Sequence, residues 1–147
     1  MDRILVAVDG SETALKAVDF ASKLAAQTDA ELTLLTVVDE AHVGDRALRD
    51  FARAEHLAAA WGDLSETRAS EILIAGHERA AAYEGVRVRK DWRSGNPAAE
   101  IARYARETHA DLVVVGNTGH SRFAGALLGS VAFKLLTTAP CPLTVVR

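Results

Sequence analysis

The sequence of 147 residues contains one cysteine, no long apolar run and no excess of basic residues. Cys141 has no partner for an internal disulfide, so we expect a protein of the cytoplasm rather than of an oxidising compartment. No stretch approaches the roughly 20 apolar residues of a membrane helix, and the first residues lack the pattern of a signal peptide. We therefore expect no membrane partner.

The acidic charge balance limits the class of ligand. With a formal net charge of −3, the chain is not expected to bind nucleic acid, because such proteins need a basic surface for the phosphate backbone. One phosphorylated small molecule remains compatible, because it needs only a local site. Apolar residues make up 49% and charged residues 25%, which is typical of a globular protein. Without repeats or linkers, the length predicts a single domain spanning residues 1–147.

Short runs rich in β-branched and apolar residues predict strands of a parallel sheet, buried on both faces where the run is unbroken. Five such strands are expected, at residues 4–8, 31–38, 86–92, 111–116 and 143–146. The third of them alternates between apolar and polar residues. This favours a position nearer one edge of the sheet, with Arg87, Arg89 and Asp91 facing water.

The segments between the strands either space their apolar residues as a helix does or are rich in Ala, Glu and Arg, so they are expected to be helical. Helices are predicted over residues 14–28, 45–61, 65–83 and 130–137, with one more starting at Pro97 behind an Asn96 N-cap. Gly62 and Gly76 leave open whether the middle region is two helices or one bent helix. Alternating strands and helices predict an α/β fold, in which an open parallel sheet carries helices on both faces.

Two strand exits carry unusual residues. The first strand ends at residues 9–11 (DGS) and the fourth at residues 116–119 (GNTG). Ligands of open α/β sheets bind beyond the carboxyl ends of the strands, where the strand order reverses. If both exits belong to one site, the first and fourth strands are neighbours, and the five strands are ordered 3-2-1-4-5.

The loop after the fourth strand has the pattern G-x2-G-x9-G-S, formed by Gly116, Gly119, Gly129 and Ser130. Glycines let a backbone turn tightly and approach a ligand closely. The amides of Gly129, Ser130 and Val131 would point outward at a helix N-terminus, which is a suitable place for an anion. A strand-to-helix connection also uses Gly and Ser simply to turn and cap. From these residues alone, both interpretations stay open.

Several familiar nucleotide and catalytic motifs are missing from the sequence. There is no Walker A loop and no G-x-G-x-x-G after the first strand. No Ser, His and Asp constellation specifies a hydrolase, and Cys141 between two prolines is expected to be a packed residue rather than a nucleophile. The exit of the first strand is too short to cradle the phosphate of a flavin.

Three segments carry a resemblance to a known family. Residues 115–147 (VGNTGHSRFAGALLGSVAFKLLTTAPCPLTVVR), 4–11 (ILVAVDGS) and 95–101 are similar to the corresponding segments of universal stress proteins. The resemblance spans the chain and is weak only over residues 39–85. It implies an adenine nucleotide alpha-hydrolase-like fold. Because the glycine loop is intact, it also implies ATP binding, with Mg²⁺ expected beside the nucleotide.

The resemblance also implies where the nucleotide is bound. Gly116, Gly119, Gly129 and Ser130 would approach the phosphates and ribose. Asp9 would lie near the ribose, the phosphates or a bound metal ion, and Val37 or Val38 would flank the adenine. The complete expected set is Ala7, Asp9, Val37, Val38, Gly116, Asn117, Gly119, His120, Gly129, Ser130, Val131 and Ala132.

The expected set contains one departure and two open alternatives. ATP-binding members often carry Ser or Thr where this chain has Ala132, so binding is expected to be weaker by about 1 kcal/mol. Asp9 could instead be the N-cap of the first helix, unless Ser11 takes that position. His120 and Arg122 could balance phosphate charge or simply be solvated loop residues.

These features predict a nucleotide-dependent regulatory protein of the stress response. One alternative is a slow ATPase, in which Asp9 orients water and His120 or Arg122 supplies positive charge. Another is a dimeric interaction module that has stopped binding nucleotide. The resemblance points to a homodimer through residues 143–146, since an apolar strand at a sheet edge needs to be covered; the alternative is an edge covered by the chain's own helices.

Overall fold

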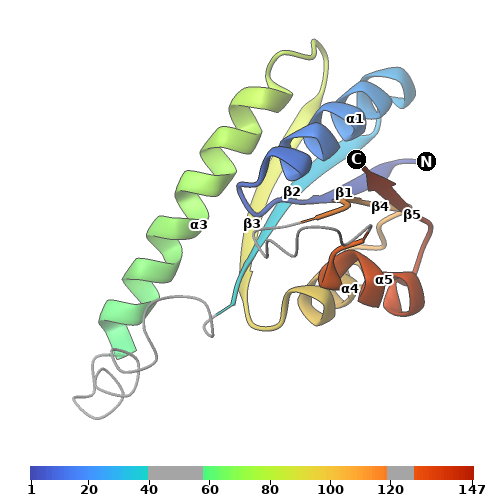
Figure 1. The fold of residues 1–147 in the computed structure, drawn as a ribbon. Coiled ribbons are helices and arrows are strands. Elements are labelled where there is room, and N and C mark those ends of the chain that lie inside the picture. The colour runs from blue at the N-terminus through green and yellow to red at the C-terminus, as the bar shows by residue number, and fades with distance from the viewer. Residues whose placement is uncertain (40–57, 119–127) are drawn as a thin grey trace.

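The computed structural model describes residues 1–39, 58–118 and 128–147. Its centre is one sheet of five parallel strands in the order β3-β2-β1-β4-β5 (Figure 1). The strands are β1 Arg3–Ala7, β2 Glu31–Val38, β3 Arg87–Ser94, β4 Leu112–Gly116 and β5 Leu143–Val146. The predicted α/β class and strand order are confirmed, and the order reverses between β1 and β4.

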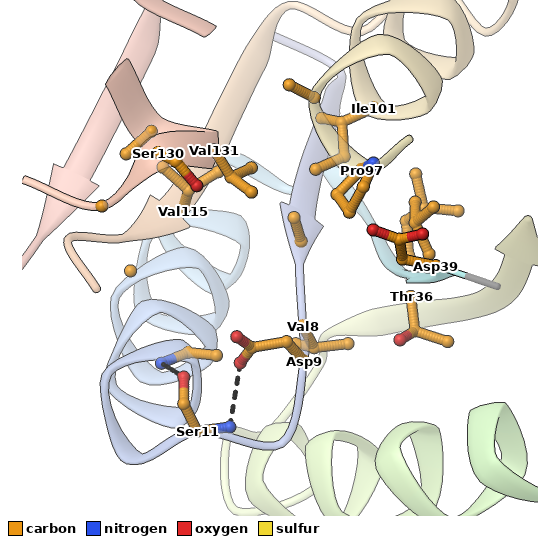
Figure 2. Close-up of a pocket in the computed structure, with 18 of the residues that line it drawn as sticks. Val8, Asp9, Ser11, Thr36, Asp39, Pro97, Ile101, Val115, Ser130 and Val131 are labelled. Atoms are coloured by element: carbon orange, nitrogen blue, oxygen red, sulfur yellow. Dashed lines mark hydrogen bonds between the residues drawn. The ribbon is translucent and has the colours of Figure 1, made fainter. Parts of the chain in front are cut away.

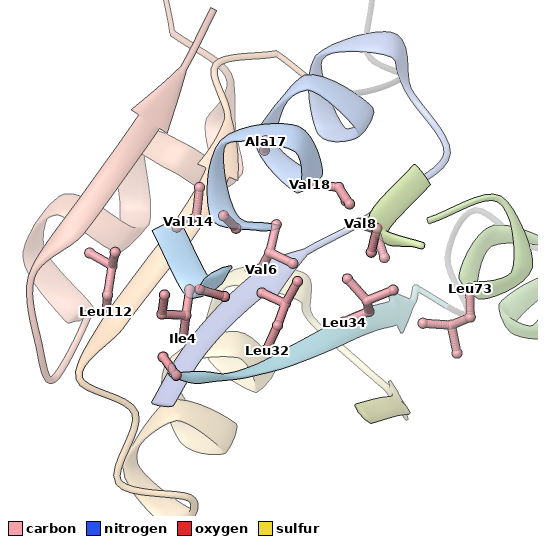
Figure 3. Close-up of a cluster of buried hydrophobic side chains, with 14 residues drawn as sticks. Ile4, Val6, Val8, Ala17, Val18, Leu32, Leu34, Leu73, Leu112 and Val114 are labelled. Carbon is pink, nitrogen blue, oxygen red and sulfur yellow. The ribbon is translucent and has the colours of Figure 1, made fainter. Parts of the chain in front are cut away.

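Two pairs of helices cover the two faces of the sheet (Figure 1). They are α1 Glu12–Thr28, α3 Ala58–Ala80, α4 Pro97–Glu107 and α5 Ser130–Thr138. Alternate residues of each strand point to opposite faces, so Ile4 and Val6 pack beneath α1 and α3, and Leu5 packs beneath α4 and α5. Figure 3 shows the first of these two cores, with Leu73 of α3 approaching Leu34 of β2. None of the described helices is long and apolar enough to span a membrane.

The helix starts agree with the local sequence signals. The Asn96 side chain accepts a hydrogen bond from the Ala99 amide at 3.2 Å, and Pro97 takes the first position of α4. At α1 the open question is settled: Ser11 is the N-cap and accepts from the Ala14 amide at 3.2 Å. Asp9 is therefore not the cap of this helix.

The middle helix continues through both of its glycines. Over the described residues, α3 runs without a break past Gly62 and Gly76. A Cβ at Gly76 would lie 3.4 Å from the end of the Leu34 side chain, an ordinary van der Waals contact, so this turn of the helix packs directly against β2. Packing against the sheet outweighs the low helix propensity of glycine. The expected helical residues 45–57 lie outside the described ones.

β3 is an edge strand, as its alternation predicted. Arg87 and Arg89 are exposed, but Asp91 does not simply face water. Its carboxylate lies 3.1 Å from the Arg93 guanidinium, which in turn stacks over the Tyr104 ring. Burial, together with the nearby Asp91 charge, raises the pKa of Tyr104. The prediction for Asp91 therefore holds only in part: its side chain is 37% exposed, and the rest of it is covered because Arg93 and Tyr104 lie beside it.

Candidate functional site

A cavity of about 670 Å³ opens at the carboxyl ends of β1, β2 and β4, where the strand order reverses (Figure 2). This volume is typical of small-molecule sites. The expected residues that line it are Ala7, Asp9, Val37, Val38, Gly116, Asn117, Gly129, Ser130, Val131 and Ala132. The remaining two, Gly119 and His120, lie outside the described residues, as does Arg122. The structure therefore brings together every expected residue that it describes.

The turn after β1 holds Asp9 at the cavity wall. Gly10 takes a positive φ of 83°, a conformation that favours glycine. The turn lets Asp9 Oδ1 accept a hydrogen bond from the Ser11 amide at 2.9 Å, and Ser11 then caps α1 (Figure 2). The carboxylate is thereby fixed beside the cavity, where its oxygens are suitable ligands for a hard cation such as Mg²⁺.

Close contact between β4 and α1 explains Gly116. A Cβ at this position would lie 2.8 Å from the Thr13 backbone carbon and 3.0 Å from the Ala14 nitrogen, distances that folded proteins do not tolerate. Just beyond it, the Thr13 hydroxyl donates to the Thr118 carbonyl in a short hydrogen bond. Gly116 lines the cavity, but the first turn of α1 already requires a glycine there.

Backbone hydrogen bonds tie the two described ends of the glycine loop together. The Asn117 amide donates to the Val146 carbonyl at 2.7 Å, and the Gly129 amide donates to the Asn117 carbonyl at 2.5 Å. The start of α5 is thus fixed directly beside the exit of β4.

The first turn of α5 presents unused backbone donors. Gly129 is the N-cap, in an extended conformation with φ −71° and ψ 159°, and has no side chain to cap the helix. The amides of Ser130, Val131 and Ala132 lack intrahelical acceptors, and no other described residue accepts from them. All three residues line the cavity. Together with the helix dipole, these amides favour an anion at this end.

Two further parts of the lining, one on each face of the sheet, come from residues that the sequence did not assign to the site. Pro97, Ala98 and Ile101 of α4 and Ile72 of α3 contribute apolar surface. One signal was available, because the Asn96 and Pro97 pattern marks a helix starting at the carboxyl edge of β3. No local signal pointed to α3, which reaches the cavity only by packing across β2.

Thr36 is a second residue that the sequence did not single out. It lines the cavity from β2 and is 1% exposed (Figure 2). Its hydroxyl is buried and has no hydrogen-bond partner among the described residues. A buried hydroxyl without a partner destabilises a fold relative to an apolar group of the same shape. The fold alone therefore gives no reason for a threonine rather than a valine here.

Among the described residues, neither Cys141 nor a cluster of metal-ligating side chains offers a second candidate site. Cys141 packs against the core beneath α4 and α5, and burial raises the pKa of its thiol, so it is not a reactive thiolate. No group of three or more metal-ligating side chains occurs in the described ranges. The cavity at the reversal of strand order is the site to which the expected residues converge.

Comparison with known proteins agrees with this geometry. The model of the universal stress protein family matches residues 1–147. The chain belongs to the universal stress protein family. The universal stress protein YxiE of Bacillus subtilis is 35% identical over 147 residues, covering 99% of each chain. The resemblance of residues 4–11, 95–101 and 115–147 is thus confirmed at the level of the family.

Solved structures of universal stress proteins share the fold. UspA from Lactobacillus plantarum is 28% identical with a TM-score of 0.80, and the match covers 99% of this chain and 97% of that one. A universal stress protein solved in complex with cAMP is 27% identical with a TM-score of 0.72, covering 99% and 96%. The fold of this universal stress protein is therefore one in which a relative holds an adenine nucleotide.

Proposed function

We propose that this universal stress protein binds ATP with Mg²⁺ in the cavity at the carboxyl edge of the sheet and acts as a nucleotide-dependent regulator of the stress response in the cytoplasm. The observation that carries the proposal is that the amides of Ser130 to Ala132, at one end of this cavity, have no acceptor among the described residues. The complex of a relative with cAMP supports an adenine nucleotide as the ligand class.

Each part of the nucleotide has a matching part of the wall. The phosphates would lie against the amides of α5, with the Ser130 hydroxyl as a further donor. The adenine would lie against the apolar surface of Val37 and Val38, and Asp9 would face the ribose or hold Mg²⁺ beside the phosphates. A ligand that binds only one state of the protein shifts the population toward that state.

Hydrolysis of the bound ATP is a second candidate function. It is favoured by the presence of two carboxylates, Asp9 and Asp39, in the wall of the cavity. Either could orient a water molecule toward the phosphate chain. Release of ADP by the wild-type protein, abolished in an Asp9→Asn variant that still binds ATP, would establish this activity.

Calorimetric titration with ATP, in the presence and absence of Mg²⁺, tests the binding function. The wild-type protein is expected to show one saturable site per chain, with tighter binding when Mg²⁺ is present. Asp9→Asn keeps an oxygen that can accept from the Ser11 amide, so the turn should survive while the charge is lost. This variant is expected to lose the effect of Mg²⁺. Absence of ATP binding by folded wild-type protein would refute the proposal.

We further propose a homodimer formed through β5. Among the described strands, β5 pairs only with β4 and is therefore an edge. The carbonyl of Pro142 accepts from Val113 of β4, and that of Val146 accepts from Asn117 just after β4. Alternate residues therefore bond inward, and the amide of Val145 faces the open edge. A second copy of this strand would satisfy that amide and cover the apolar edge.

Val145→Pro is expected to weaken dimerisation without unfolding the chain. Proline removes the outward amide but leaves the inward hydrogen bonds to β4, and proline is tolerated on edge strands. Because twofold symmetry doubles the loss, the dissociation constant should rise about tenfold or more. Analytical ultracentrifugation measures the change. Val145→Thr keeps the amide and serves as the control. An unchanged dissociation constant in Val145→Pro would place the interface elsewhere.

A further inference from the structure

The charged residues of the cavity wall are unevenly placed. Among the described lining residues, the acids are Asp9 and Asp39, at the exits of β1 and β2, and the bases are Arg68 and Lys134. These four charges cancel. A nucleotide with a phosphate chain adds several negative charges, so its affinity depends on which cation lies near the amides of α5.

Arg68 is poorly placed to neutralise a phosphate chain that lies near the amides of α5. It belongs to α3, which packs with α1 on the face of the sheet opposite α5 (Figure 1). Its guanidinium lies 4.0 Å from the Glu71 carboxylate on the same helix, and 55% of its side chain is exposed. The positive charge of Arg68 is therefore partly balanced by Glu71, and the helix that carries it packs on the other face of the sheet from α5.

Lys134 is better placed. It lies on α5 four residues after Ser130, so the two side chains share one face of the helix, and both line the cavity. Helical side chains lean toward the N-terminus, which directs this lysine toward the first turn and its unused amides. It forms no ion pair with any residue in the described part of the chain.

We propose that Lys134 binds the phosphate chain of the nucleotide and makes this site prefer di- and triphosphates to cyclic monophosphates. The amides of α5 can hold one phosphate group, whereas a longer chain brings additional charge that needs a mobile cation nearby. Ala132 offers no hydroxyl in the first turn, which increases the share of binding that falls to the lysine. This inference rests on the proposed nucleotide site.

Titrations of three ligands against two substitutions at this position test the proposal. In Lys134→Gln the affinity for ATP should fall about tenfold, the affinity for cAMP should fall only two- to threefold, and the affinity for adenosine should not change. Raising the salt concentration should weaken ATP binding less in this variant than in the wild type. Lys134→Arg keeps the charge and should retain most of the ATP affinity. Lys23→Gln, at an exposed position of α1 outside the cavity wall, is the matched control for net charge.

The outcomes separate this inference from the proposed function. If Lys134→Gln leaves the ratio of ATP to adenosine affinity unchanged, or if Lys23→Gln lowers it equally, the inference is overturned while the nucleotide site stands. If the wild-type protein binds neither ATP nor adenosine, the proposed site itself is wrong. Adenosine makes this distinction because it reports on the base pocket without any phosphate.

Discussion

Gly116→Ala is expected to lower the free energy of unfolding by about 3 kcal/mol, at the upper end of the range for overpacked positions. The added Cβ would lie 2.8 Å from the Thr13 backbone carbon and 3.0 Å from the Ala14 nitrogen. Backbone atoms cannot turn aside as the end of a side chain can, so α1 must move away from β4. Urea denaturation measures the loss as a lower midpoint with an unchanged slope.

Gly62→Ala is the matched control for this experiment. A Cβ at Gly62 meets nothing within 4 Å, and the residue lies within α3. This replacement is expected to stabilise the protein by about 0.5–1 kcal/mol, because alanine has the higher helix propensity. If Gly116→Ala leaves stability unchanged, the close approach of β4 to α1 is wrong. If it destabilises the protein as expected, loss of ATP binding in that variant carries no information about phosphate contacts.

Ser130→Pro is expected to lower the affinity for ATP about a hundredfold while leaving the fold intact. Proline suits the first position of a helix, and the residue before a proline prefers the extended backbone that Gly129 already adopts, with φ −71° and ψ 159°. The change removes one amide and one hydroxyl from the proposed phosphate site. Losing a hydrogen bond to a charged group and a further hydroxyl contact accounts for a change of this size. Calorimetric titration with ATP and a thermal melt measure the two effects.

Ser130→Ala separates the hydroxyl from the amide. It removes only the side-chain donor, so we expect a smaller loss, about fivefold to tenfold. If Ser130→Pro binds ATP as tightly as the wild type, the phosphates do not lie at the N-terminus of α5, and the cavity holds the ligand in another orientation. Unchanged thermal stability of the proline variant is needed for either conclusion.

Local patterns in the sequence predicted most of the helices and strands of the fold. All five predicted strands are present, and α4 starts where Asn96 and Pro97 predicted a helix start. The order of the strands followed from the assumption that the ends of the first and fourth strands belong to one site. The course of α3 past Gly62 and Gly76 could not be predicted, because packing against β2, rather than helix propensity, decides whether the helix continues.

The sequence predicted only part of the lining of the candidate site. The glycine loop and the end of β1 pointed to residues of β1, β4 and α5, and the family resemblance added Val37 and Val38 of β2. The wall formed by Pro97, Ile101 and Ile72 was missed, because an apolar residue that lines a cavity looks the same in sequence as one that fills a core. Thr36 was missed for a similar reason, since a single threonine in an apolar strand does not reveal that its hydroxyl lacks a partner.

The sequence by itself determined the elements, the α/β class and the position of the glycine loop, because hydrophobic periodicity and turn chemistry act between near neighbours in the chain. Only the tertiary structure decided why Gly116 must be a glycine and which lysine shares a cavity with the amides of α5. The reason is physical: the contact of Gly116 with Thr13, and the walls that enclose the cavity with Lys134, join segments far apart in sequence. Their distances depend on how helices pack on the sheet.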